Sequence, residues 1–299
     1  MRNILRIASV FFNFFWLSSV YSQAGFDAFF KPSDTLHQAR RNAVVISESV
    51  LTATALVVLN QLWYADYPKS NFHTVNDNSN WMQMDKLGHV YSAYHLGRFS
   101  AEMLQWSGVS KKDQLLYGAG YGFAFLTAVE VFDGYSAEWG FSWGDIFSNA
   151  VGTSLYVSQE MLWKEQRIIP KFSFHTTSYA NQRPELLGSS LSEQILKDYN
   201  GQTYWLSANV ASFFKTTAIP KWANLALGYG ADGMTSAIDT QNQERYRQFY
   251  LSLDVDLTKI KSNSYFLKSL FSVFNMVKIP APTFEINTSG NSKFYFFYF

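Results

Sequence analysis

The spacing of apolar residues changes near Pro170, and this change constrains the fold more than any other feature of the sequence. Before Pro170 the apolar residues recur with the period of an α-helix, and after it they alternate along the chain. No stretch rich in glycine, serine or proline separates the two parts. The sequence therefore predicts an α+β protein, with a helical domain at 23–165 packed against an antiparallel β-rich region at 166–299.

The first 22 residues have the pattern of a secretory signal peptide. Arg2 and Arg6 form a basic start, Ile7–Leu17 is an apolar run, and Val20-Tyr21-Ser22 fits a cleavage site. We therefore expect residues 1–22 to be removed and the mature chain to reside in the cell envelope, in the outer membrane or on its periplasmic side. With 0 Cys in the sequence, disulfides, thiolate metal sites and a cysteine nucleophile are excluded.

The composition favours a protein at a membrane. Aromatic residues make up 18% of the chain and charged residues only 16%, and aromatic rings are enriched at membrane interfaces. The mean hydropathy of −0.10 argues against a chain built mostly of spanning helices. The formal net charge is +1, without a basic patch interleaved with aromatics, so nucleic acid is not expected as a partner. Membrane lipid or an outer-membrane protein is expected instead, and self-association into a homo-oligomer is a further way to complete an incomplete set of strands.

The helical domain is expected to be a bundle of about four helices. Ser110 and Ser142 each precede an acidic residue by three positions, which is the capping-box pattern of a helix start. Three glycines at alternate positions of the third helix permit close approach of a neighbouring helix. The apolar run of that helix is short for a bilayer span and fits a buried core helix equally well. The four expected ranges are about 35–64, the Asp85 segment up to 108, 110–134 and 142–163.

The β-rich region is expected to contain about six strands and one amphipathic helix. In the clearest strand, Leu251 and Leu253 share one face while Ser252 and Asp254 share the other. The expected strands are about 171–179, 204–214, 222–231, 246–257, 283–287 and 293–299, with the helix at 265–277.

The chain ends on six consecutive aromatic residues, Phe294–Phe299. This ending resembles the C-terminal signal of outer-membrane β-barrel proteins, which combine alternating strands with aromatic girdles. About six strands are fewer than the roughly eight of a single-chain barrel. We therefore expect an outer-membrane-like β region and not a complete barrel.

Polar residues recur at helical spacing inside the apolar bundle. Asp85 and His89 are four residues apart and share a helix face, and a carboxylate beside an imidazole sets its tautomer and raises its basicity. Acidic and amide residues follow at the same kind of spacing on the next two helices, so the three faces can enclose one site. The candidate polar network comprises Asp85, Lys86, His89, Glu130, Asp133, Ser142, Asp145 and Asn149.

Two functions fit these residues. In the first, which the sequence favours, the buried network is structural, and the protein is a non-enzymatic envelope protein that binds lipid or a partner. In the second, the chain is a membrane-bound, metal-dependent hydrolase or transferase acting on lipid or cell-wall precursors. Its candidate catalytic residues are Asp85, His89 and Glu130, and a divalent cation would bind at His89, Glu130 and Asp145.

The order of these motifs resembles a known family. Asp85-Lys86-x-x-His89, then Glu130, then Ser142-x-x-Asp145 with Asn149 and Gly152, is similar to the YfiM-like family of predicted periplasmic lipoproteins and more distantly to VanZ-like membrane proteins. The resemblance covers about 81–156, and the region from Lys171 onward looks like an extension found in Bacteroidetes members. It implies an envelope location and no established reaction. A sequence without cysteine departs from the lipoprotein pattern, which leaves membrane contact to the aromatic strands.

Overall fold

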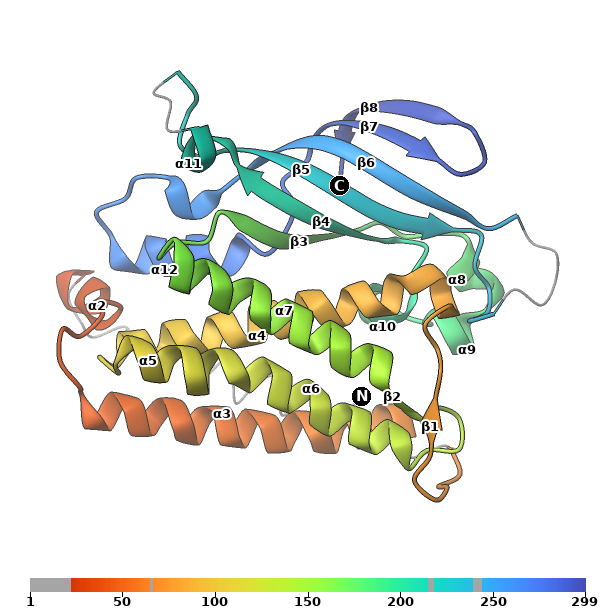
Figure 1. Ribbon diagram of the computed structural model, residues 1–299, viewed down its shortest axis with the longest axis horizontal. Helices are drawn as coiled ribbons and strands as arrows, with labels where there is room; N and C mark the ends of the chain where they lie inside the picture. The colour runs from red at the N-terminus through yellow and green to blue at the C-terminus, as the bar shows by residue number, and fades with distance from the viewer. Residues whose placement is uncertain (1–22, 65–66, 215–217, 239–243) are drawn as a thin grey trace.

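The computed structural model describes residues 23–64, 67–214, 218–238 and 244–299, and the expected signal peptide lies outside this part of the chain. A layer of helices lies on one side of the molecule and a six-stranded sheet on the other (Figure 1). The α+β prediction, with helices first and an antiparallel sheet in the C-terminal part, is confirmed.

The helical layer is built around α4 (Met84–Trp106), which packs against its neighbouring helices and against two strands of the sheet. On the side away from the sheet lies α3, at the bottom of Figure 1. The other long segments are α3 (Gln38–Leu59) with the π-turn η1 (Asn60–Tyr64), the run α5 (Lys111–Asp113), η3 (Gln114–Gly118) and α6 (Ala119–Gly134), and α7 (Trp143–Leu162).

Glycines let α4 approach its neighbours closely. A Cβ atom at Gly122 of α6 would lie 2.4 Å from the carbonyl oxygen of Ala93, and one at Gly152 of α7 would lie 2.2 Å from that of Val90. Both distances are too short for a carbon atom, so only glycine fits. Gly120, in contrast, has no atom within 4 Å of such a Cβ, because it faces away from α4.

The sheet has the order β3-β4-β5-β6-β7-β8, and all neighbours are antiparallel. The sheet is strongly curled. The side-chain hydroxyls of Tyr298 in β8 and Thr203 in β4 are hydrogen-bonded at 3.2 Å, although three strands lie between β4 and β8. The strands are β3 (Ile168–Phe174), β4 (Gln202–Asn209), β5 (Ala223–Asp232), β6 (Tyr246–Val255), β7 (Ala281–Asn287) and β8 (Ser292–Tyr298).

Several short elements were not expected from the sequence. The predicted strand 204–214 ends at Asn209, and the helix α11 (Val210–Phe214) follows it. Helices of only a few residues carry too little apolar periodicity to be detected. The others are α2 (Gln23–Phe29), β1 (Thr74–Val75), η2 (Asn80–Gln83), β2 (Phe141–Ser142), α8 (Tyr179–Gln182), α9 (Pro184–Leu187), α10 (Leu191–Lys197) and η4 (Leu257–Lys259), while α12 (Tyr265–Phe274) is the predicted amphipathic helix.

The two faces of the sheet have the reverse of the usual polarity. On β6, Leu251 and Leu253 are exposed, while Ser252 and Asp254 are buried on the inner face. In water-facing antiparallel sheets the apolar residues lie inside and the polar residues outside. The outer face is apolar from β4 to β8, with exposed Leu206, Leu225, Leu227, Phe249, Phe284, Ile286, Phe294 and Phe296.

The inner face of the sheet is a polar interior in which charges are paired. Lys171 and Asp254 are both fully buried and form an ion pair of 2.8 Å. Ser207 donates to the same carboxylate at 2.6 Å, and Trp205 packs beside Tyr250. Buried charges are tolerated only when they are paired and hydrogen-bonded, as they are here.

Two helical segments are long and apolar enough to cross a membrane by length and composition: Gln38–Leu59 and Lys111–Gly134. Only 6% of the most apolar stretch of the first and 28% of the second is buried. The buried-core interpretation of the third helix therefore does not fit this structure.

Candidate functional site

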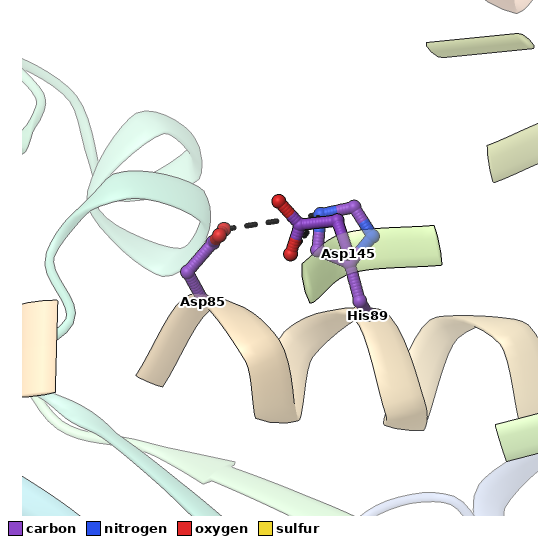
Figure 2. A group of neighbouring side chains, drawn as sticks. All are labelled: Asp85, His89 and Asp145. Carbon is purple, nitrogen blue, oxygen red and sulfur yellow. Dashed lines mark ion pairs between the residues drawn. The ribbon is translucent and has the colours of Figure 1, made fainter. Parts of the chain in front are cut away.

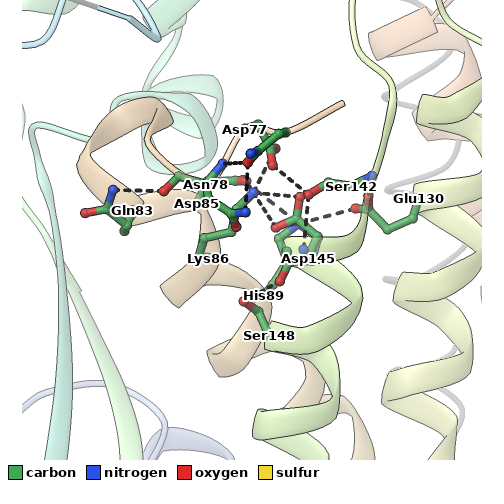
Figure 3. Close-up of polar contacts among 12 residues, drawn as sticks. Asp77, Asn78, Gln83, Asp85, Lys86, His89, Glu130, Ser142, Asp145 and Ser148 are labelled. Carbon is green, nitrogen blue, oxygen red and sulfur yellow. Dashed lines mark hydrogen bonds and ion pairs between the residues drawn. The ribbon is translucent and has the colours of Figure 1, made fainter. Parts of the chain in front are cut away.

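The predicted polar residues meet at the end of the helical layer where α4 and α7 begin and α6 ends (Figure 3). Asp85, Lys86 and His89 lie in the first two turns of α4, and Asp145 lies in the first turn of α7. The first turn of a helix has unpaired N–H groups and a partial positive charge, which stabilise nearby carboxylates. The two helix starts therefore gather acidic side chains at one place.

Lys86 is the centre of this cluster. Its Nζ lies 2.7 Å from Asp77 Oδ2, 3.1 Å from Asp85 Oδ2 and 2.8 Å from Asp145 Oδ1. Its side chain is only 12% exposed, so these contacts are shielded from solvent. The ammonium group ties a loop, α4 and α7 together.

His89 lies one turn along α4 from Asp85 and beside Asp145 (Figure 2). Its Nδ1 is 3.0 Å from Asn149 Oδ1, and since a carboxamide oxygen only accepts, Nδ1 carries a proton. Its Nε2 faces carboxylate oxygens of Asp145, Glu130 and Asp85 at 3.5, 3.6 and 3.9 Å. These separations exceed direct hydrogen bonds but are within the range of strong charge interaction.

Burial and neighbouring charges shift the pKa values of the titratable residues in the cluster, and not all in the same direction. Burial alone would lower the pKa of His89, but the carboxylates of Asp85, Asp145 and Glu130 outweigh it and raise that pKa. Burial would likewise lower the pKa of Lys86, which Asp85 and Asp145 raise instead. The pKa of Asp145 is raised to about 6 by burial and by the charge of Asp85. For Asp85, His89 and Lys86 overcome the effect of burial and lower the pKa.

Ser142 has the predicted capping role and a second contact. Its Oγ accepts the backbone N–H of Asp145 at 3.2 Å and donates to Asp77 Oδ1 at 2.6 Å. Its own backbone N–H donates to Glu130 Oε2 at 3.2 Å. The start of α7 is thus joined both to the end of α6 and to the loop before α4.

Asp133 is held separately from the rest. Its Oδ1 accepts the hydroxyl of Tyr64 at 2.7 Å, and no ion pair between Asp133 and Lys86 or His89 occurs in the described part of the chain. The structure therefore brings together seven of the eight predicted network residues and attaches the eighth to η1.

Sequence reasoning missed two residues that contact the cluster. Asp77 comes from the asparagine-rich loop before α4, where an acidic residue has no periodic pattern to mark it. The hydroxyl of Tyr199 donates to Asp85 Oδ1 at 2.9 Å from the region after β3. The C-terminal half thus supplies part of the site.

The turn that leads into α4 is strained. Trp81, Met82 and Gln83 have φ values of 48°, 52° and 68°, the left-handed region that non-glycine residues adopt rarely and at a cost of about 1–3 kcal/mol each. The sheet holds the turn in place, since Tyr229 donates to the carbonyl of Met82 at 2.6 Å. Strain of this kind occurs where a structure fixes neighbouring groups, and the neighbours here are Asp85 and Lys86.

The residues present can provide a cation site. Asp85, His89 and Asp145 each offer one ligand atom, and these atoms lie within 4.8 Å of one another. Asp145 is buried, and its Oδ1 also faces His89 Nε2 at 3.5 Å. Oxygen and imidazole ligands suit Mn²⁺, Zn²⁺ or Fe²⁺. The Lys86 ammonium, 2.8 Å from the same oxygen, already supplies one positive charge.

Comparison with known proteins gives one match. No curated protein and no solved structure matches this chain. A family model matches residues 74–159, which include the start of α4, the end of α6 and most of α7. Over this segment the chain is similar to the family described as "Predicted periplasmic lipoprotein (DUF2279)", which supports an envelope protein on the periplasmic side.

Proposed function

We propose that this chain is a non-enzymatic envelope protein that contacts membrane lipid through its sheet and helical layer. In this proposal the Lys86 cluster has a structural role and holds the starts of α4 and α7 together. The observation that carries this proposal is the reversed polarity of the sheet. Leu227 at 60% and Leu253 at 58% exposure lie outside, while Lys171 and Asp254 are buried within. Exposing a continuous apolar face to water is costly, whereas the same face is favourable in lipid.

Exposed apolar residues in the helical layer favour lipid, and not a second copy of the chain, as what covers the apolar surface. Exposed apolar side chains also occur on α3 and α7, for example Val50, Val57, Phe147 and Leu162, and α3 lies opposite the sheet (Figure 1). One dimer interface covers a patch on one side of a protein. Apolar surface on two opposite layers needs an environment that surrounds both.

The aromatic C-terminal strand favours the outer membrane among the envelope membranes. Phe296 at 77% and Phe297 at 80% exposure are consistent with contact to the lipid interface, where aromatic rings are enriched. The YfiM-like resemblance agrees with an envelope location without adding a reaction.

Membrane fractionation with single-cysteine labelling tests the proposal, and the absence of native cysteine makes this direct. We expect carbonate-resistant recovery with the outer membrane. In intact membranes Leu227→Cys should resist a water-soluble maleimide until the protein is denatured. Ser192→Cys, on the exposed side of α10, is the control and should react at once. Recovery in the soluble fraction, or equal reactivity of both cysteines, would overturn the proposal.

The ligand atoms of Asp85, His89 and Asp145 favour a second candidate, the cation-dependent hydrolase or transferase. In that function Asp85, Asp145 and His89 Nε2 would hold the cation, and the cation would lower the pKa of a bound water molecule. Elemental analysis of the purified protein separates the candidates. Stoichiometric metal that is lost in a folded Asp145→Asn variant would favour the cation-dependent enzyme. Absence of metal from the wild-type protein would favour a structural role of the Lys86 cluster.

A further inference from the structure

A large cavity lies at the end of α4 opposite the Lys86 cluster. Its volume is about 1050 Å³, just above the ~300–1,000 Å³ typical of ligand pockets. It lies between the C-terminal half of α4, the short helix α2 and the amphipathic helix α12. Its walls are largely apolar and aromatic, with Phe29, Phe99, Met103, Trp106, Tyr265 and Phe271 among the lining residues.

Two of the three cations that line the cavity are already paired. Arg98 donates to Glu102 at 2.9 Å and to the carbonyl of Ser272 at 3.0 Å. Lys259 donates to Glu165 at 2.7 Å. These two carboxylates are the acidic residues of the lining, so the pairs use all of its negative charge.

Lys268 is the remaining cation. It lies on the exposed side of α12, and its ammonium stands 4.9 Å from the ring centre of Tyr265. No carboxylate lies within 4.0 Å of it among the described residues. The charge of Asp27 interacts with Lys268, although the two groups form no ion pair, and Asp27 Oδ1 caps α12 by accepting from Ser264 Oγ at 2.5 Å and from the N–H of Phe266 at 2.9 Å.

We propose that this cavity binds a single-chain amphiphile, with the acyl chain along the aromatic wall and the anionic head group against Lys268. An apolar cavity, with a cation at its edge that forms no ion pair within 4.0 Å among the described residues, complements such a molecule in both shape and charge. The choice of an acyl chain rests on the membrane association proposed above. The cavity itself and the pairing of its charged residues do not depend on whether the sheet lies in a membrane.

A palmitic acid analogue that carries a diazirine tests this proposal by photolabelling of the full chain in vesicles of zwitterionic lipid, followed by peptide mapping. We expect labels on α2, α4 and α12. Lys268→Glu should reduce this labelling roughly tenfold, the effect of losing one charge-assisted contact. The same substitution at Lys261, which is exposed and outside the lining, should leave it unchanged.

A second variant keeps the test decisive if Lys268→Glu misfolds. Ser269→Trp places a ring in the cavity and should also abolish the labels there while circular dichroism remains unchanged. Labels confined to the outer face of the sheet, or labels in the cavity that neither variant reduces, would overturn the cavity proposal. Labels in the cavity of a protein recovered as soluble would instead overturn only the membrane proposal.

Competition separates the two sources of such a molecule. Loss of the cavity labels with unlabelled palmitate but not with lysophosphatidylglycerol, a single-chain anionic lipid, would identify a free fatty acid. Loss with both would identify the acyl chain of an anionic lipid. Retention of the labels against both competitors would show that the site does not recognise this chemistry.

Discussion

Lys86 supplies the positive charge that balances three carboxylates of the cluster. Lys86→Met keeps the length of the side chain and removes the cation between Asp77, Asp85 and Asp145. We expect the free energy of unfolding to fall by about 3 kcal/mol, because breaking a buried ion pair leaves the partner charges uncompensated. Urea unfolding measures this change. Lys261→Met, at an exposed position, is the control and should stay within about 0.5 kcal/mol of wild type.

His89 gives the protein a pH-dependent stability. Its pKa is raised above the ordinary 6.5 in the folded state, so its protonated form is favoured by folding. This contribution is complete below pH 6.5 and is lost as the pH rises through the folded pKa of His89. We expect the melting temperature, measured with a chelator present, to fall over that interval. His89→Gln should show a weaker fall, and an equal slope in both proteins would exclude His89 as its source.

The residues of the cluster were only partly predictable from the sequence. Asp85 with His89, and Asp145 with Asn149, are visible because positions four apart share a helix face. Asp77 and Tyr199 lie outside the long helices, and their contacts with Lys86 and Asp85 come from the tertiary fold. Asp133 had the right spacing, but its hydroxyl partner Tyr64 draws it to another helix.

At the scale of elements, close packing of α6 on α4 depends on which glycine faces the neighbouring helix. Gly122→Ala would place a Cβ 2.4 Å from the carbonyl oxygen of Ala93, so the helices must separate. We expect a loss of about 1–3 kcal/mol in the free energy of unfolding, as for other overpacked positions. Gly120→Ala, two residues away, meets no atom within 4 Å and should be neutral or gain up to about 1 kcal/mol from helix propensity. Equal effects of the two variants would contradict this packing.

The long elements were predictable and the short ones were not. The apolar periods of 84–106 and 246–255 extend over many residues, so their type and approximate ends follow from the sequence. The helices between β3 and β4 have four to seven residues and are held by contacts with the rest of the chain. The left-handed turn at 81–83 is likewise imposed by the sheet and carries no sequence signal.

For the whole molecule, the alternation of β6 shows that its two faces differ but not which of them is buried. The same pattern of Leu251, Ser252, Leu253 and Asp254 suits a sheet with its apolar face inside or outside. The curl of the sheet around Lys171 and Trp205 decides the matter, because it closes the polar face and leaves the leucines outside. An apolar exterior on the sheet and on α3 is a property of the assembled fold.

Whether lipid or water covers the outer face of the sheet determines how much a charged residue placed there lowers the free energy of unfolding. In lipid, Leu251→Lys should lower the free energy of unfolding by about 2–4 kcal/mol and reduce recovery in the membrane fraction. In water, the same change at a side chain that is 45% exposed should have an effect within about 0.5 kcal/mol. Leu196→Lys is the matched control, since this leucine of α10 is 62% exposed and lies outside the sheet. Urea unfolding from lipid vesicles compares the two variants. A clear loss for Leu251→Lys alone supports a lipid-facing sheet, and equal, small effects would mean that water covers it.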